Sequence, residues 1–462
     1  MSDSPAASTT PPAEQTAPIR LYGPRFWCVY AANTSLMVAV SLLFRYSDFV
    51  HLLGGDELNL GLIIGVGMTG SLVVRVFQGV GIDRYGNRLI WLVSLLLFSA
   101  SCLAHLLVTH VDGPLVVAVR VVLNVSIAGC FGASISYITR TAPLARMAEV
   151  VGTLGSSGFV GMITGPALGD LIFGPGPVEP QHIRWMFAVA AGLAGVSFVL
   201  AWFATLGQTV PPRRRRPPIA GVLRRYHPGA VLAVGIAMGF GIGLPGVFLR
   251  PFSAQLEISG MAWFFTVYAL VAFAMRMAVR RLPERIGNRP MVLMGLGFLA
   301  AGMLAFLLVH NEWQLVFPAV AIATSHAMLF PSVVAEVNSA FPGRYRGLAT
   351  TLILGMVDIG TLVGAPTIGA IVRIASLAGA PPYPSAFITA ALLLAGIGVF
   401  YAVAGRRVTA GSRRNVRVLA TVAPGAQAVA PVAQAVAPGA QAVVPIRPEA
   451  GSDEPEALPV EA

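Results

Sequence analysis

The chain has 462 residues, of which 56% are hydrophobic and only 11% are charged, and its formal net charge is +11. Globular proteins carry about 25% charged residues. So few charges cannot cover a water-facing surface of this size, which excludes an ordinary soluble protein. All 31 basic residues are arginines, and they are dispersed between apolar runs rather than gathered in one domain, which argues against nucleic-acid binding.

Both ends of the chain are polar. Residues 1–20 lack the basic and apolar regions of a signal peptide, and we expect a disordered cytoplasmic tail there. Residues 422–442 form a seven-residue repeat whose regularly spaced prolines exclude a continuous helix, so we expect residues 406–462 to be a disordered, low-complexity cytoplasmic tail. The three cysteines lie in apolar runs without metal-ligand spacing, and we expect no metal and no cofactor.

The region between the tails consists of long apolar windows. Windows of about 20 apolar residues predict helices that span a bilayer, and the chain therefore reads as an all-α membrane protein. The twelve predicted spans are 26–49, 58–80, 89–109, 114–138, 148–172, 184–205, 229–251, 261–281, 290–310, 313–338, 347–373 and 384–404. An Arg/Pro-rich interval at 208–228 divides them into an N-terminal bundle (21–207) and a C-terminal bundle (229–405), each of six helices.

The charges in the junctions between spans set the orientation. Every second junction, from the first onward, carries acids, and we call this side the acidic end: Asp56 and Glu57, Asp112, Glu179, Glu257 and Glu312. The other junctions carry arginines, and we call this side the basic end: Arg84 and Arg88, Arg140 and Arg146, 213–216, Arg280 to Arg289, Arg344 and Arg346. The positive-inside rule predicts that the basic end and both termini are cytoplasmic.

The two halves repeat each other in sequence. "RVFQGVGIDRYGNR" (75–88) aligns with "RMAVRRLPERIGNR" (276–289), and "RMAEVVGTLGSSGFVGMITGPALG" (146–169) aligns with "RGLATTLILGMVDIGTLVGAPTIG" (346–369). "LFR" at 43–45 also matches "FLR" at 248–250. Three matches in order, at a nearly constant offset, indicate an internal duplication. Parallel repeats of six helices with a binding site between them are typical of secondary transporters.

These motifs resemble those of the major facilitator superfamily, and the resemblance extends from about Arg20 to Arg407. The junction after the second span resembles the family's GxxxDRxGRR, with Asn87 in place of one basic residue, at Gly79, Asp83, Arg84, Gly86 and Arg88. Span 148–172 resembles the family's antiporter motif, with Asp170 in place of the final glycine, at Gly152, Gly161, Gly165, Pro166 and Gly169. Arg120 resembles a conserved arginine of the fourth helix, although Leu123 and Asn124 replace the glutamine and glycine expected after it.

Other features resemble a particular branch of the family. The arginines inside spans 58–80 and 261–281 and the stretch "GMVDIGTLVGAP" are similar to those of sugar-efflux-like and metallophore-exporter-like permeases.

The resemblance implies that the loop around Asp83 is a latch that closes the cytoplasmic side. The orientation rule alone does not predict an acid at Asp83. An acid at this position can pair with an arginine or accept hydrogen bonds from a helix N-terminus in the same half. Gly79 permits close helix packing, and Gly86 permits positive φ. The second copy has Arg280 where Gly79 stands, and we expect a weaker latch from its residues: Glu284, Arg285, Gly287 and Arg289. A plain topology signal is the alternative.

The glycines of span 148–172 form one helical face. Gly161, Gly165 and Gly169 are spaced four apart, and Pro166 can bend the helix. We expect this face to make a sealing contact between the two halves, with ordinary close packing as the alternative.

Ionisable side chains inside the spans are costly and therefore mark candidate functional sites. Asp358, near the middle of span 347–373, is the first candidate for proton coupling or for binding a cationic group, and burial disfavours its charged form unless an arginine pairs with it. His326 can titrate near neutral pH, although a core histidine is equally expected. Arg120 can bind an anionic group or modulate a carboxyl.

Four arginines form two pairs related by the repeat. Arg45 and Arg250 lie near the acidic end, where Asp48 and Asp170 are potential partners and an outer gate is expected, with snorkelling as the alternative. Arg75 and Arg276 lie near the basic end and are assigned to an inner gate. The resemblance places Asn33 and Asn124, with His326, on cavity-lining helices.

The sequence contains no enzyme motif and no ATP-binding motif. We therefore expect a monomeric secondary transporter in a bacterial inner membrane, exporting a small molecule by alternating access with proton coupling. Uptake or uniport of an anionic metabolite and a transporter-like sensor or assembly protein are the alternatives. The substrate, the direction of transport, the coupling ion and the role of the C-terminal repeat are not determined by the sequence.

Overall fold

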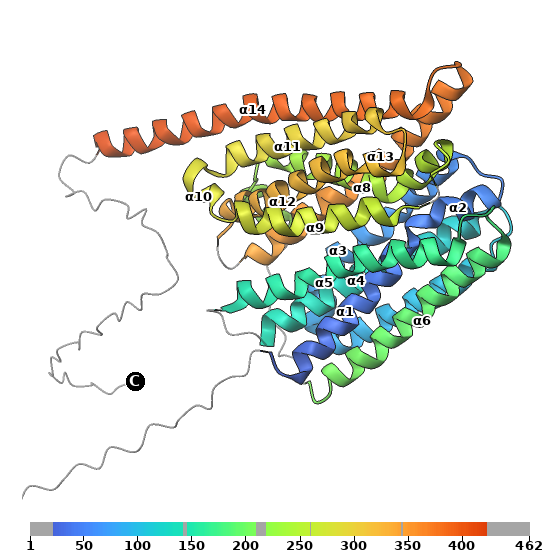
Figure 1. The fold of residues 1–462 in the computed structure, drawn as a ribbon. Coiled ribbons are helices and arrows are strands. Elements are labelled where there is room, and N and C mark those ends of the chain that lie inside the picture. Colours follow the sequence, from blue (N-terminus) through green and yellow to red (C-terminus); the bar gives the residue numbers. More distant parts are fainter. Residues whose placement is uncertain (1–21, 142–145, 209–218, 259, 343–344, 423–462) are drawn as a thin grey trace, which may run out of the picture. The chain divides into compact units, whose positions relative to one another are not determined.

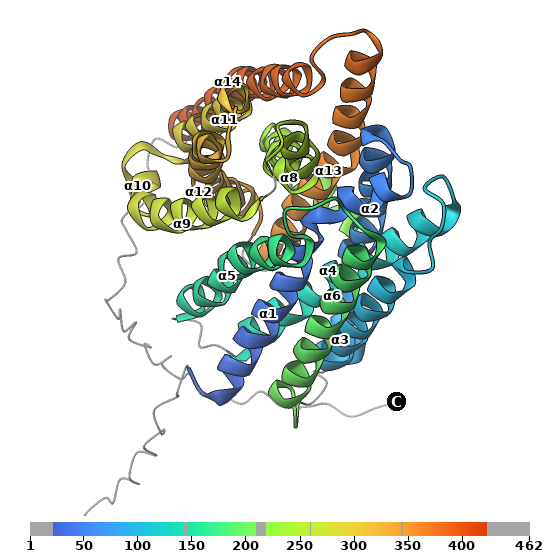
Figure 2. The ribbon, with the colours of Figure 1, turned by 45° about the vertical axis from the view of Figure 1, so that its right-hand side comes forward.

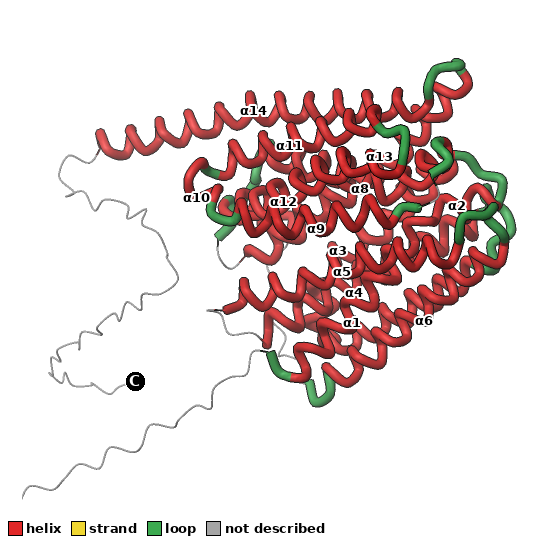
Figure 3. The backbone as a smooth tube through the Cα atoms, in the orientation of Figure 1, coloured by secondary structure: helices red, strands yellow, loops and turns green. Residues whose placement is uncertain are grey.

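The computed structural model describes residues 22–141, 146–208, 219–258, 260–342 and 345–422. The predicted N-terminal tail and most of the seven-residue repeat lie outside these residues. Every regular element in the described part of the chain is a helix (Figure 3).

The N-terminal half contains α1 Pro24–Leu42, the short 3-10 helix η1 Leu43–Arg45, α2 Tyr46–Leu52, α3 Glu57–His105, α4 Pro114–Thr141, α5 Met147–Phe173 and α6 Pro180–Ala204. The C-terminal half contains α8 Val231–Gln255, α9 Ala262–Val279, α10 Leu282–Ile286, α11 Asn288–Ala305, η3 Phe306–Leu308, η4 Glu312–Leu315, α12 Val316–Ser339, α13 Arg346–Leu377 and α14 Pro382–Val422. Between the halves, α7 Ile219–Arg225 lies in the predicted linker.

Eleven described helical segments are long and apolar enough to cross a bilayer, and α3 supplies two of them. The fifth predicted span corresponds to α5, which is not among the eleven. Helix α5 contains six glycines and several hydroxyl side chains. The fold is therefore that of an all-helical, multi-span membrane protein, as the hydropathy predicts.

Local sequence signals explain where the helices begin and end. Asp56 caps α3 by accepting a hydrogen bond from the Asn59 amide, while the Asn59 side chain accepts one from the Asp56 amide. Gly174, with φ 60°, ends α5. Helix α14 continues to Val422, the last described residue, beyond the predicted span end at 404 and into the segment predicted to be disordered.

The two copies of the predicted repeat share an unusual backbone geometry. The backbone of α3 leaves the helical conformation at Gly86 (φ 82°, ψ 161°), and Gly287 adopts nearly the same angles (φ 84°, ψ 164°) before α11. Residues with a Cβ rarely adopt this conformation, so the positive φ expected at Gly86 is present and is repeated in the second half.

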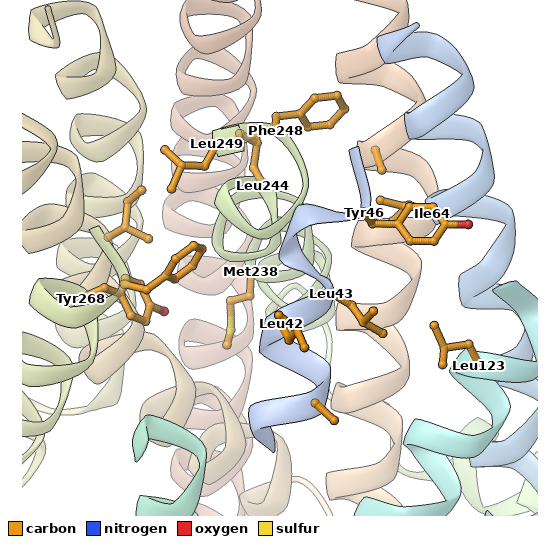
Figure 4. Packing of buried hydrophobic residues seen from close by; sticks show 14 of the residues in the cluster. Leu42, Leu43, Tyr46, Ile64, Leu123, Met238, Leu244, Phe248, Leu249 and Tyr268 are labelled. Atoms are coloured by element: carbon orange, nitrogen blue, oxygen red, sulfur yellow. The ribbon is translucent and has the colours of Figure 1, made fainter. Parts of the chain in front are cut away.

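The helices pack as two bundles, one from each half (Figures 1 and 2). In the first, α1 packs against α5 and α6, and α3 packs against α4 and α6; in the second, α8 packs against α13, and α12 packs against α9 and α11. The bundles meet where α3 packs against α13 and α5 against α9. Figure 4 shows part of the buried core, including Leu42 and Tyr46 of the first bundle and Met238 and Leu244 of α8.

Glycines allow the backbones to approach at these helix contacts. A Cβ atom at Gly239 of α8 would overlap the carbonyl oxygen of Val357, and one at Gly360 of α13 would overlap that of Ile236. The contact between the bundles is equally close, since Cβ atoms at Gly61 and Gly369 would overlap the carbonyl oxygens of Ala365 and Glu57.

Replacing Gly239 by alanine tests this packing. Because the obstructing atom belongs to the backbone of α13, we expect Gly239→Ala to destabilise the protein by about 1–3 kcal/mol and to lower the thermal midpoint of the purified protein. Gly195 of α6 is the control, because a Cβ there would meet nothing within 4 Å. An unchanged midpoint for Gly239→Ala, together with a lowered one for Gly195→Ala, would contradict the packing described.

Candidate functional site

An ion pair joins the two bundles at a buried position. Asp358 of α13, which is 7% exposed, accepts hydrogen bonds from the Arg75 Nε and, at 3.1 Å, from the Arg75 Nη2 of α3. The Ser71 hydroxyl, one turn away on α3, donates a third bond of 2.6 Å. The structure thus brings together the predicted coupling carboxyl and one predicted inner-gate arginine, and their bidentate geometry stabilises both charges away from water.

A second charge cluster lies near the acidic end. Arg45, only 1% exposed, donates to Asp48 (3.0 Å) and to Asp170 (2.8 Å), and its guanidinium lies over the Phe173 ring at 4.5 Å. Arg250 of α8 donates to both oxygens of the same Asp48, at 3.0 and 3.1 Å. The predicted partners are therefore correct, and Asp48 links arginines that the repeat relates to each other.

Asp170 also connects α5 to the second bundle. Its Oδ2 accepts hydrogen bonds of 2.8 Å from the backbone amides of Met261 and Ala262, at the N-terminus of α9. These amides have no partner within the helix, and the helix dipole favours a negative charge there. Asp170, which replaces the final glycine of the family motif, thus binds Arg45 with one oxygen and the N-terminus of α9 with the other.

Two further contacts near the acidic end join the bundles. The Tyr383 hydroxyl donates to Glu57 at 2.9 Å, and Arg373 lies 3.4 Å from Asp56. The acidic junction residues were predicted only as orientation signals. Among the described residues, hydrogen bonds and ion pairs join the two bundles at two places. One is the acidic end, and the other is the contact of Asp358 with Arg75 and Ser71.

At the basic end, Asp83 pairs with Arg140 of α4 at 2.9 Å, within its own half. Arg88 donates to the Thr205 carbonyl at 3.3 Å and lies over the Trp202 ring, and Arg289 donates to the equivalent region of α14, the Ala402 carbonyl. Arg84 lies over the neighbouring Tyr85 ring.

The second copy of this junction makes fewer contacts. Glu284 and Arg285 form no ion pair or hydrogen bond with another described residue, whereas Asp83 pairs with Arg140. The weaker latch expected there stays a prediction. Gly79 lies within α3, and its surroundings lie outside the part of the chain that the structure describes.

The predicted role of the glycine face in α5 is wrong. Cβ atoms at Gly161 and Gly165 would meet α1 at Met37 and Ser41 of the same bundle, and Gly169 lies against the Arg45 side chain. The sequence repeat could not show which neighbour this face contacts; Phe159 and Asp170, on another part of α5, reach the second bundle instead. Gly152 has nothing within 4 Å of a built Cβ, and Pro166 lies inside the helix.

The remaining arginine of the repeat-related pair is in a different environment. Arg276 of α9 is half-buried, and its guanidinium lies over the Phe159 ring of α5 at 5.4 Å. Two turns earlier on α9, the Tyr268 hydroxyl lies 2.5 Å from the Nδ1 of His326 on α12. His326 therefore belongs to a tyrosine–histidine pair that the sequence did not predict.

Three predicted polar residues lie inside the first bundle. Asn33 donates to Ser157 at 2.7 Å, and this bond joins α1 to α5. Arg120 lies over the Tyr46 ring at 4.4 Å, and its Nε and Nη1 are buried without a hydrogen-bond partner among the described residues. The Asn124 Nδ2 is also buried and unpartnered within that set.

Comparisons with known proteins agree with this architecture. The family model described as Major Facilitator Superfamily matches residues 26–259 and 231–433. "Multidrug resistance protein 2" of Bacillus subtilis is 22% identical over 354 residues, which cover 74% of this chain and 86% of that protein. An uncharacterized MFS-type transporter of Methanocaldococcus jannaschii is 18% identical over 349 residues, covering 73% and 88%.

Solved structures show the same fold at low sequence identity. The nucleoside transporter NupG aligns with a TM-score of 0.68 and 11% identity, covering 82% of this chain and 98% of that one. A bacterial homolog to the human lysosomal transporter Spinster aligns with a TM-score of 0.64 and 15% identity, covering 82% and 96%. A POT family transporter in complex with 5-aminolevulinic acid aligns with a TM-score of 0.67 and 12% identity, covering 84% and 96%.

The Asp170 contacts predict a local effect of substitution. Asp170→Asn removes the charge that binds Arg45 and the α9 terminus, so we expect backbone amides 261 and 262 to exchange with deuterium about tenfold faster, which corresponds to about 1.4 kcal/mol of local opening. Hydrogen-exchange mass spectrometry of the purified protein measures this. Asp112→Asn, a change at an exposed acid of the same end, is the control, and equal exchange in wild type and Asp170→Asn would disprove the capping role.

Proposed function

Because the chain belongs to the Major Facilitator Superfamily, which consists of membrane transporters of small molecules, we propose that it exports its substrate by proton-coupled alternating access. The single observation that carries the coupling is the ion pair between Asp358 and Arg75, because it is buried and connects the two bundles. Export is supported by the likeness to "Multidrug resistance protein 2". The proposed location is the inner membrane of a bacterial cell. The junction charges support an orientation in which the basic end faces the cytoplasm.

The proposed coupling uses the carboxyl of Asp358. When it is ionised, it holds Arg75 and so fastens α13 to α3; when a proton binds, the attraction is lost and the two helices can separate. A change in protonation then shifts the population between two arrangements of the bundles. The hydroxyl of Ser71 remains as a hydrogen-bond partner for either form of the carboxyl.

The packing of the bundles supports a conformation that is closed at the acidic end. Contacts of Asp48, Asp170, Glu57 and Asp56 with the second bundle all lie there. At the opposite end of α5, a Cβ at Gly152 or Gly155 would meet nothing within 4 Å. We assign the described arrangement to an inward-facing state, in which the cluster of Arg45, Asp48 and Arg250 acts as the outer gate.

Asp358→Asn tests the coupling. We expect it to abolish substrate accumulation driven by a pH gradient in proteoliposomes and to preserve exchange of substrate, because the amide cannot bind and release the coupled proton. The measurement uses a panel of anionic, neutral and cationic fluorescent dyes. Asp112→Asn is the matched control.

Because Asp358→Asn leaves the Arg75 charge buried without its partner, the double variant Asp358→Asn/Arg75→Gln is measured beside it. Gradient-driven accumulation that keeps its wild-type pH dependence in both variants would show that Asp358 is not the coupling acid. Dye movement in the opposite direction would replace export by uptake.

Asp83→Asn tests the proposed latch. We expect the initial transport rate to fall about tenfold, because the substitution removes the ion pair with Arg140 that organises the basic end. Glu284→Gln is the repeat-related control and should change the rate less than about twofold, since Glu284 has no partner among the described residues. If both substitutions change the initial transport rate equally, the latch proposal is contradicted, and Asp83 serves only as a signal for membrane orientation.

A further inference from the structure

The internal repeat is broken at one charged position. Arg75 and Arg276 occupy equivalent places in the two copies, as do Asp358 and Gly158 in the aligned stretches 346–369 and 146–169. Arg75 therefore has its acid in the opposite bundle, whereas the position that would supply an acid to Arg276 is a glycine. The duplication that satisfies one arginine leaves the other without an equivalent partner.

The surroundings of Arg276 agree with this asymmetry. Among the described residues, Arg276 makes neither an ion pair nor a hydrogen bond, and its guanidinium contacts the face of the Phe159 ring. An aromatic face attracts a cation but does not neutralise it or accept its N–H bonds. Arg276 is nevertheless half-buried at the contact between α5 and α9, where a guanidinium with free donors is costly.

Among the described residues, the position of the first side-chain atom of the missing acid is open. Gly158 directly precedes Phe159, and a Cβ built on Gly158 would meet only the Cε of Met37, at an ordinary contact distance of 3.8 Å. The Phe273 ring lies 6.4 Å from the Phe159 ring, so a second apolar ring lies beside the one that the guanidinium contacts. The combination is one positive charge with free donors beside aromatic surface.

We propose that Arg276 binds an oxyanion, a carboxylate or phosphate, on the molecule that this protein carries, with the apolar part of that molecule against Phe159 and Phe273. This inference rests on the proposed function and specifies its substrate class as amphiphilic anions. The planar guanidinium matches an oxyanion in a bidentate geometry, and the ligand supplies the negative charge that Asp358 supplies to Arg75. The same chemistry occurs on the headgroup of an anionic lipid.

Matched probes that differ in charge test the proposal on the purified full-length protein. Salicylate and phenyl phosphate should raise its thermal midpoint in a concentration-dependent way, whereas the neutral salicylamide should not. Arg276→Ala should weaken the stabilisation by salicylate at least tenfold, and Arg276→Lys should retain part of it. Arg280→Ala, which removes a charge one turn further along the chain, should behave as wild type.

A second pair of variants covers the case in which Arg276→Ala fails to fold. Gly158→Asp supplies the acid of the other repeat and should abolish the response to salicylate, while the isosteric Gly158→Asn should preserve it. A wild-type response in Arg276→Ala or in Gly158→Asp overturns the proposal, as does equal stabilisation by salicylate and salicylamide.

Lipid nanodiscs distinguish the two sources of the anion. Stabilisation by salicylate in both phosphatidylcholine and phosphatidylglycerol discs identifies a soluble ligand, and stabilisation only in phosphatidylcholine identifies a lipid headgroup that competes for Arg276. No stabilisation in either kind of disc overturns the proposal. Because this is an equilibrium measurement, Asp358→Asn should still bind salicylate. Salicylate binding together with unchanged gradient-driven transport in this variant would refute the proposed coupling and leave the anion site intact.

Discussion

A charge inside the apolar interior of this protein needs an opposite charge or an aromatic face, and this constraint determines how the two bundles meet. Arg45 is almost completely buried and is held by two carboxylates and the Phe173 ring. One of those carboxylates, Asp48, also binds Arg250 of the other bundle. The ion pair of Arg75 and Asp358 follows the same rule, so the charges that are costly to bury are also those that connect the halves.

The glycines complement these charges. Contact between α3 and α13 brings backbones so close that Gly61 and Gly369 cannot carry a side chain without a shift. This close approach places Ser71 and Arg75 beside Asp358. An arrangement held by close backbone packing and by an ion pair between the bundles can exist in two discrete forms, as the proposed alternating access requires.

Much of the fold was predictable because the signals are local or periodic. Apolar windows gave the positions of the spans, the positive φ expected at Gly86 is present and recurs at Gly287, and matched arginines pointed to Asp48 and Asp170. The glycine face of α5 was assigned to the wrong neighbour, because a face suited to close packing does not identify which helix it meets. Tyr383 and Tyr268 were not assigned partners, since their contacts depend on helices far away in the sequence.

The sequence by itself determined the apolar spans, the alternating charge of the junctions and the duplication, because each depends on composition or spacing along the chain. Only the tertiary structure decided which charges are satisfied. Arg75 and Arg276 are equivalent in the sequence repeat, but one faces an aspartate across the bundles and the other faces a phenylalanine ring. The physical reason is that pairing depends on distances between helices. A single difference between the repeats, glycine at 158 for aspartate at 358, leaves Arg276 without an ion pair among the described residues, whereas Arg75 has one.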